Sequence, residues 1–280
     1  MEKTLKVLLS EKGVQLKKAY GQNFLTDTVL LNEIVEGAGI TKDDTVLEIG
    51  CGAGALTKVL SEKAKKVVGY EIDKTLTPVL DETLKDCGNV TIVYKDIMKE
   101  RIDAVEKQLG GEYKLVANLP YYITTPVIMK FLENSYAIRS MTVMVQEEVA
   151  RRFAASPKSS DYGAITVGIN LRGSAEIIMK VGREKFTPVP NVDSAVVNIL
   201  VEKDKFKGED LSKIRETVRT AFSGRRKTLA NNLINGYKFS RKDAERVLEI
   251  CGFSPLCRGE TLSAEEFVVL TKAIEEVKRG

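Results

Sequence analysis

The chain of 280 residues contains no histidine. Histidine is the side chain whose ordinary pKa lies closest to neutral pH. It supplies the general base of Ser-His-Asp and Cys-His sites, and it is the commonest metal ligand. Such catalytic centres and histidine metal sites are therefore excluded. Whatever chemistry the protein performs does not depend on an imidazole.

Cysteine is scarce, and its spacing fits no metal site. The four cysteines form no Cys-x-x-Cys pair: Cys51, Cys87, Cys251 and Cys257. Zinc-site spacing is absent, and a disulfide framework is not typical of a chain of this size. We expect reduced thiols, no bound metal and a cytoplasmic protein.

Long apolar runs are missing as well. No run approaches the roughly 20 residues needed to cross a bilayer. Residues 1–12 mix charged with apolar residues and lack the apolar segment and small-residue cleavage site of a secretory signal. The sequence also has no internal repeat and no low-complexity tract. We therefore expect no membrane association.

Charge is distributed unevenly along the chain. Residues 1–201 carry 26 Lys and Arg against 26 Asp and Glu, whereas residues 202–280 carry 17 against 13. The densest basic cluster, opposed only by Glu216, consists of Arg215, Arg219, Arg225, Arg226 and Lys227. This asymmetry is consistent with an anionic partner on the C-terminal part, but charge alone equally fits a solvated helix face.

Strands and helices alternate along residues 45–146, at a spacing typical of a mostly parallel sheet flanked by helices. Two further strands, at 175–181 and 194–201, have no obvious helix between them and predict an antiparallel end of the sheet. In the remaining residues the apolar positions follow a helical period. We predict an α/β domain at 1–203 and a small helical domain at 204–280.

The segment Thr45–Thr57 joins a short apolar strand to a glycine-rich turn and a helix-forming stretch. Glycine lets backbone N–H groups approach a ligand because it has no Cβ. The spacing Gly50-x-Gly52-x-Gly54 differs from the dinucleotide pattern, whose third glycine comes one residue later. Glu48 is also unexpected inside a purely structural strand. We interpret the segment as a nucleoside-binding turn, for S-adenosylmethionine rather than NAD. Taken alone, it also fits a tight turn that binds nothing.

Polar residues follow the next three strands. Glu71 ends the second strand, 21 residues after Gly50, where a carboxylate grips a ribose diol in doubly wound folds. Asp96 follows the third strand in a loop that can reach an adenine amino group, and Asn118 ends the fourth strand. Each residue alone fits an ordinary strand end or turn. Together, at one edge of the sheet, they predict a pocket for an adenosyl group.

The motif Asn118-Leu119-Pro120-Tyr121 suits methyl transfer to the exocyclic amine of adenine. This amine is a poor nucleophile because its lone pair is delocalised into the ring. The Asn118 side-chain carbonyl and the backbone carbonyl of Leu119 or Pro120 can accept from its two N–H groups and orient the nitrogen. Tyr121 can stack on the extruded base, and positioning then supplies most of the rate gain without a strong base. Four residues alone also fit a proline turn beside a core tyrosine.

Six motifs carry a resemblance to a known family: Gly21–Leu25, Leu47–Gly54, Glu71–Asp73, Asn118–Tyr121, Phe186–Ser194 and Phe222–Leu229. With them the chain resembles the KsgA family of small-subunit ribosomal RNA adenine N6,N6-dimethyltransferases over nearly its whole length. The resemblance implies an α/β fold, namely a class I S-adenosylmethionine-dependent methyltransferase domain with a Rossmann-like, mostly parallel seven-stranded sheet. It also implies a small all-α C-terminal domain that helps to grip RNA.

The resemblance further assigns a substrate and roles to residues. It implies methylation, twice each, of two adjacent adenosines in a hairpin near the 3′ end of 16S RNA. It implies that S-adenosylmethionine is bound by Asn23, Leu25, Gly50, Gly52, Glu71, Ile72, Asp96, Ile97 and Asn118. Asn118 to Tyr121 and Phe186 hold the target adenine, with the two aromatic rings on either side of the base.

We expect RNA to be bound through its shape and phosphates by Arg225, Arg226 and Lys227. The expected protein is a monomer whose partner is 16S RNA or the assembling small ribosomal subunit.

Two other functions remain open. Erm-type methylases of large-subunit RNA share the glycine turn and an Asn-x-Pro-aromatic motif, but the segments Phe186–Ser194 and Arg225–Leu229 favour the KsgA family. A non-catalytic RNA-binding factor for ribosome assembly that merely retains the fold is the other alternative. The intact Glu71 and Asn118 argue against lost cofactor binding.

Overall fold

The contacts of the computed structural model divide the chain into two units. The structure describes residues 5–14, 23–224 and 226–279. One unit, here called the sheet unit, comprises Met1–Ala150 and Ala175–Val201, and the other, the helical unit, comprises Arg151–Ser174 and Glu202–Gly280. Among the residues that the structure describes, no helix is long and apolar enough to cross a membrane.

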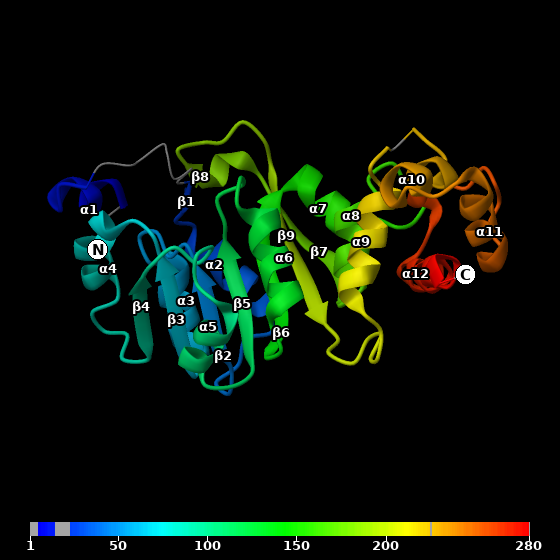
Figure 1. Ribbon diagram of the computed structural model, residues 1–280. Helices are drawn as coiled ribbons and strands as arrows, with labels where there is room; N and C mark the ends of the chain where they lie inside the picture. The colour runs from blue at the N-terminus through cyan, green and yellow to red at the C-terminus, as the bar shows by residue number, and fades with distance from the viewer. Residues whose placement is uncertain (1–4, 15–22, 225, 280) are drawn as a thin grey trace. The chain divides into compact units, whose positions relative to one another are not determined.

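A seven-stranded sheet with the order β4-β3-β2-β5-β6-β9-β7 organises the sheet unit (Figure 1). Its strands are β2 (Thr45–Ile49), β3 (Lys66–Glu71), β4 (Val90–Tyr94), β5 (Tyr113–Asn118), β6 (Ile138–Gln146), β7 (Gly173–Val181) and β9 (Ser194–Val201). Neighbouring strands from β4 to β6 are parallel, and β9 is antiparallel to β6. The predicted α/β class, with its mostly parallel sheet and antiparallel end, is confirmed.

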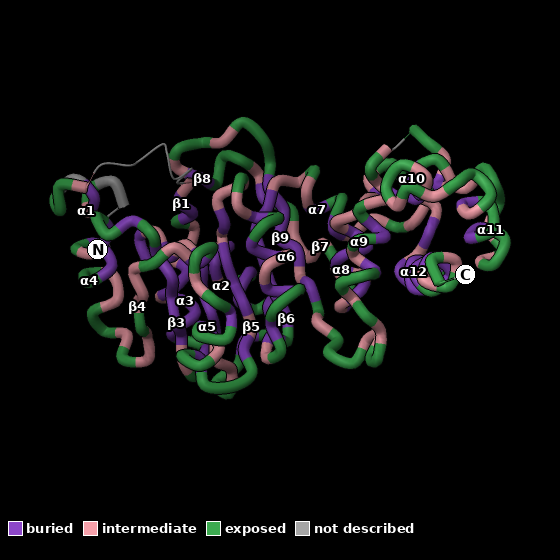
Figure 2. The backbone as a smooth tube through the Cα atoms, viewed as in Figure 1, coloured by how far each residue is buried: buried purple, intermediate pink, exposed green. Residues whose placement is uncertain are grey.

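The central strands are apolar because neighbouring elements cover both faces of a parallel sheet. Val46 and Leu47 of β2 and Val67 and Val68 of β3 are fully buried, and Figure 2 shows the buried strands in the middle of this unit. The register places Ile49 opposite Tyr70. The carboxyl ends of β2 and β3 therefore reach the same edge of the sheet, together with that of β5.

Helices connect the strands and supply the rest of the core. They are α1 (Leu5–Glu11), α2 (Thr28–Gly37), α3 (Ala55–Lys63), α4 (Thr77–Thr83), α5 (Ile102–Leu109), α6 (Thr124–Asn134) and α7 (Glu147–Phe153). Asp27 caps α2 as expected, because its carboxylate accepts from the backbone N–H groups of Val29 and Leu30. The helices α1 and α5 have no predicted counterpart.

A second, two-stranded sheet joins segments that are far apart in sequence. β1 (Phe24–Leu25) pairs antiparallel with β8 (Phe186–Thr187), and Leu25 lies opposite Phe186. Strands of two residues carry no periodic pattern, so the sequence does not predict this pairing. This pairing connects residues 23–25 with the segment that contains Phe186.

The helical unit contains α8 (Ala164–Asn170), α9 (Leu211–Ala221), α10 (Leu229–Tyr237), α11 (Arg241–Cys251) and α12 (Ala264–Arg279). The predicted capping box of Ser240 and Asp243 forms at the start of α11, and Gly252 ends this helix with φ 69°. Leu233, Val247 and Phe267 meet in the core of the unit.

The division of the chain differs from the predicted boundary between residues 203 and 204: the C-terminal part of the helical unit begins at Glu202, and one earlier segment joins it. Residues 151–174 belong to the helical unit. The reason is packing: Tyr162, Val167 and Leu171 are buried in the core that the C-terminal helices form. The Tyr162 hydroxyl donates to the Leu262 backbone carbonyl at 2.7 Å.

We predict that Tyr162→Phe lowers the free energy of unfolding of the helical unit by about 1–2 kcal/mol, because the buried Leu262 carbonyl loses its donor. Urea denaturation of the full chain followed by far-UV circular dichroism measures the change. Tyr136→Phe is the control, since Tyr136 is exposed. Equal stability of the two variants would contradict the structural role of this hydrogen bond.

Candidate active site

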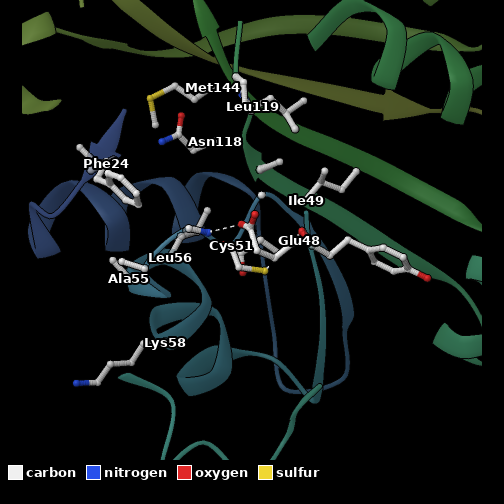
Figure 3. Close-up of a pocket in the computed structure, with 18 of the residues that line it drawn as sticks. Phe24, Glu48, Ile49, Cys51, Ala55, Leu56, Lys58, Asn118, Leu119 and Met144 are labelled. Carbon is white, nitrogen blue, oxygen red and sulfur yellow. Dashed lines mark hydrogen bonds between the residues drawn. The ribbon is translucent and has the colours of Figure 1, made fainter. Parts of the chain in front are cut away.

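A cavity of about 910 Å³ opens at the carboxyl ends of β2, β3, β4 and β5 (Figure 3). Twelve of the predicted site residues line it: Asn23, Leu25, Gly50, Gly52, Glu71, Ile72, Asp96, Ile97, Asn118, Leu119, Pro120 and Tyr121. Asn23 and Leu25 come from the segment that contains β1, and the other ten end or follow the parallel strands β2 to β5, whose register brings them to one edge of the sheet. This is the edge at which open α/β sheets bind ligands.

The turn after β2 depends on glycine. Gly50 has φ 77° and Gly52 has φ 56°, values that residues with a Cβ rarely adopt. A Cβ on Gly52 would also lie 3.0 Å from the ring of Phe24. The Gly50 N–H donates to the Tyr70 carbonyl at 2.8 Å, so the turn continues the pairing of β2 with β3.

Glu71 links this turn to the end of β3. Its Oε2 accepts from the Gly52 N–H at 2.9 Å, and its Oε1 accepts from the Asp73 N–H at 2.8 Å. Burial raises the pKa of Glu71, and these backbone hydrogen bonds offset part of that rise. The carboxylate oxygens retain acceptor capacity for hydroxyl donors in the cavity.

Glu48 lines the same cavity and is an additional polar residue that the sequence-based site lacks. Its position inside β2, where a charged side chain is unexpected, is the signal that points to it. Burial, together with the nearby charge of Glu71, raises the pKa of Glu48 to about 8. Its Oε2 has no hydrogen-bond partner among the described residues. Glu48 is therefore mostly protonated at neutral pH.

The loop after β4 forms another wall. Asp96 Oδ1 accepts from the Met98 N–H at 2.9 Å, which fixes the carboxylate beside the cavity. Ile72 and Met98 line the cavity and are partly exposed, at 47% and 36%. Apolar side chains next to a fixed carboxylate suit a flat purine that carries an amino group.

Asn118 at the end of β5 has a defined orientation. Its Nδ2 donates to the Asn23 carbonyl at 3.2 Å, so its Oδ1 is left to accept from a ligand. Figure 3 shows Asn118 on the side of the cavity where Phe24 and Met144 lie. The interaction spans 95 residues of sequence and joins the loop before β1 to the sheet.

The two backbone carbonyls proposed as acceptors differ in their partners. The Pro120 carbonyl accepts from the Ile123 N–H at 3.0 Å and from the Thr124 hydroxyl at 3.3 Å. Both of its lone pairs are used, so Leu119 supplies the better acceptor for a ligand. The Tyr121 hydroxyl lies 2.9 Å from Ser194 Oγ, which holds the ring in place.

Some predicted residues lie elsewhere. Phe186 does not line the cavity; it is 2% exposed and packs in the core with Leu25 and Met144. Arg226 and Lys227 are exposed in the helical unit between α9 and α10, and Arg225 lies outside the described residues. Tyr122, which the sequence analysis does not single out, lines the cavity and is 62% exposed.

Comparison with known proteins decides the family. The family model for ribosomal RNA adenine dimethylase matches residues 13–268. The chain belongs to this family. It is 44% identical to the ribosomal RNA small subunit methyltransferase A of a Geobacillus species over 96% of this chain and 95% of that protein. It is also 44% identical to the protein of that name from Bacillus cereus, over 96% and 94% of the two chains.

Solved structures show the same fold. A dimethyladenosine transferase from Plasmodium falciparum aligns with a TM-score of 0.78 and 25% identity, over 91% of this chain and 98% of that one. The 23S rRNA methyltransferase ErmE aligns with a TM-score of 0.69 and 28% identity, over 90% and 100%. As a member of the adenine dimethylase family, the chain is an S-adenosylmethionine-dependent methyltransferase that acts on ribosomal RNA.

The residues around the cavity fit this cofactor. Glu71 offers a carboxylate held by two backbone N–H groups, a suitable acceptor for the hydroxyls of a ribose. Asp96 offers a second carboxylate beside the apolar side chains of Ile72 and Ile97, which suit an adenine ring. The described residues contain no group of three or more Cys, Asp or Glu side chains arranged to bind a metal ion.

We predict that Glu48→Gln removes part of the pH dependence of stability. The pKa of Glu48 rises from an ordinary 4.5 to about 8 in the folded chain. Its contribution to stability is therefore complete below about pH 4.5 and is lost as pH rises through about 8. The free energy of unfolding should fall less steeply from pH 5 to 8 in the variant.

Urea titrations at several pH values test this expectation. Glu36→Gln is the control, because Glu36 is exposed on α2. If the two variants follow the same pH profile, the assignment of a protonated Glu48 is wrong.

Proposed function

We propose that the protein transfers methyl groups to N6 of two adjacent adenosines in the 3′-terminal hairpin of 16S rRNA, giving N6,N6-dimethyladenosines. The main observation behind the proposal is the hydrogen bond that Asn118 Nδ2 donates to the backbone carbonyl of Asn23. It fixes the side-chain amide so that Asn118 Oδ1 is left to accept from a ligand. The relatives named small subunit methyltransferase A support the choice of ribosomal subunit.

The lining of the cavity supports the proposed cofactor-binding residues. Glu71 accepts from the ribose hydroxyls, and Asp96 accepts from the adenine amino group. Asn118, which lines the same cavity, would contact both the cofactor and the target base. The remaining cofactor contacts come from Asn23, Leu25, Gly50, Gly52, Ile72 and Ile97. When bound, S-adenosylmethionine supplies an activated methyl group on a sulfonium.

The target amine is held by two acceptors. Asn118 Oδ1 and the Leu119 carbonyl accept from its two N–H groups and point its lone pair at the methyl group. With the cofactor bound, this arrangement would favour exchange of the cofactor's C–S bond for an N–C bond, and water would accept the proton that the nitrogen loses. Positioning of this kind needs no imidazole. Pro120 sets the turn that aims the Leu119 carbonyl.

Aromatic rings hold the base. Tyr121, fixed by its hydrogen bond to Ser194, stacks on one face of the adenine. Phe186 provides the other face; its strand β8 pairs with β1, so it is anchored to the wall that carries Leu25. Because Phe186 is buried, adenine binding requires a local rearrangement around this side chain.

RNA outside the pocket is bound by Arg225, Arg226 and Lys227 through phosphates. We propose that the protein acts as a monomer in the cytoplasm on the assembling small subunit. A second candidate is methylation of large-subunit RNA, which the likeness to ErmE favours. The higher identity to small-subunit enzymes favours the first.

We predict that Asn118→Ala lowers kcat at least about 10²-fold, because the amine loses the acceptor that orients it. Mass analysis of RNA from purified subunits, before and after incubation with S-adenosylmethionine, measures the product. The wild type should dimethylate small-subunit RNA and leave large-subunit RNA unchanged; the reverse would support the second candidate. Asn134→Ala, an exposed substitution on α6, is the control. Full activity of Asn118→Ala would refute the mechanism.

We predict that changing Arg225, Arg226 and Lys227 together to Ala weakens RNA binding and flattens its salt dependence. The slope of log K against log salt is negative, and each lost phosphate contact reduces its magnitude by about 0.7–0.9. The magnitude of the slope should therefore be smaller by about 2–3 in the triple variant. Filter binding from low to high salt measures it, with Lys207→Ala as the control. An unchanged slope would exclude these residues from the interface.

A further inference from the structure

Lys130, on the second turn of α6, is bound to a single loop by all of its donors. Its ammonium donates to the backbone carbonyls of Ile97 at 3.0 Å, Met98 at 2.7 Å and Glu100 at 2.6 Å. An ammonium has three N–H donors, so these three carbonyls use every one. The loop is the wall of the cavity that contains Asp96.

The contact is transmitted to Asp96 through one peptide group. The Ile97 carbonyl and the Met98 N–H belong to the same planar trans peptide and point in opposite directions. The carbonyl accepts from Lys130, and the N–H donates to Asp96 Oδ1 at 2.9 Å. Lys130 therefore fixes the peptide that fixes the Asp96 carboxylate.

The environment of Lys130 is consistent with a structural ammonium rather than a solvated one. Burial lowers the pKa of Lys130, and the carboxylates of Asp96 and Glu100 offset part of this effect. Removing an ammonium from water is costly unless its donors are satisfied. Here the three carbonyls satisfy them. By contrast, the Lys99 side chain on the same loop is 83% exposed, and its ammonium approaches Asp96 Oδ2 only to 3.9 Å.

We propose that Lys130 is a positioning residue that sets the selectivity of the cavity for the adenine of the cofactor. The inference rests on the proposed contact between Asp96 and the adenine amino group. A carboxylate held in place binds an amino group at that position and repels a keto oxygen. A carboxylate that can rotate away from the ligand discriminates less between the two groups. Because α6 follows the Asn118–Tyr121 motif directly, the same helix also connects the cofactor wall with the target-base motif.

The test compares binding of S-adenosylhomocysteine with that of S-inosylhomocysteine, in which a keto oxygen replaces the amino group. Isothermal titration of the full chain measures both dissociation constants. The wild type should prefer the adenosine compound about tenfold or more, as expected for a hydrogen bond to a charged acceptor. Lys130→Met should bind S-adenosylhomocysteine more weakly and lose most of this preference, whereas Lys107→Met, at an exposed position on α5, should keep it.

Two further variants separate the possible outcomes. Asp96→Asn should lose or invert the preference, because its amide can donate to the keto oxygen; if it does not, the proposed adenine contact itself is wrong. If Asp96→Asn loses the preference but Lys130→Met keeps it, only the role of Lys130 is refuted. Lys130→Gln, which retains two donors, should be intermediate. If Lys130→Met fails to fold, a wild-type preference in Lys130→Gln would overturn the proposal.

Discussion

The hydrogen bond from the Gly52 N–H to Glu71 Oε2 is the interaction on which the site depends. It joins the turn after β2 to the end of β3, and it forms only because the parallel register brings both strand ends to one edge. The turn needs a positive φ at Gly52, and the carboxylate must be buried beside it at a cost that raises its pKa. Backbone donors at Gly52 and Asp73 offset part of that cost, so the fold supports the group that binds the ligand.

The side of the cavity that carries Asn118 is assembled differently, through contacts between distant segments. The carbonyl of Asn23 orients Asn118, and the pairing of β1 with β8 places Leu25 opposite Phe186. These contacts link the segment before α2 and the segment before β9 to the end of β5. A change in any of the three segments is therefore expected to reach the orientation of Asn118, even where it touches no ligand.

Local patterns account for what the sequence predicted. The apolar strands, the glycine turn, the polar residues at strand ends and the helix caps at Asp27 and Ser240 are all encoded by neighbouring residues. Long-range packing accounts for what it missed. The pairing of two-residue strands, the burial of Phe186 and the packing of Tyr162 with the C-terminal helices have no local period. The hydrogen bond from Lys130 to the Ile97 carbonyl could not be predicted either, because every residue has a backbone carbonyl and the sequence does not mark which one a side chain will contact.

One arrangement recurs in the cavity and explains how a protein without histidine supports this chemistry. Glu71 is held by the Gly52 N–H, Asp96 by the Met98 N–H and Asn118 by the Asn23 carbonyl. In each case the main chain takes up part of the side chain's hydrogen-bonding capacity and fixes the direction of what remains. Preorganised acceptors lose little freedom when a ligand binds. In the proposed mechanism, methyl transfer to a weakly nucleophilic amine depends on alignment, so acceptors held by the backbone orient the amine and no general base is required.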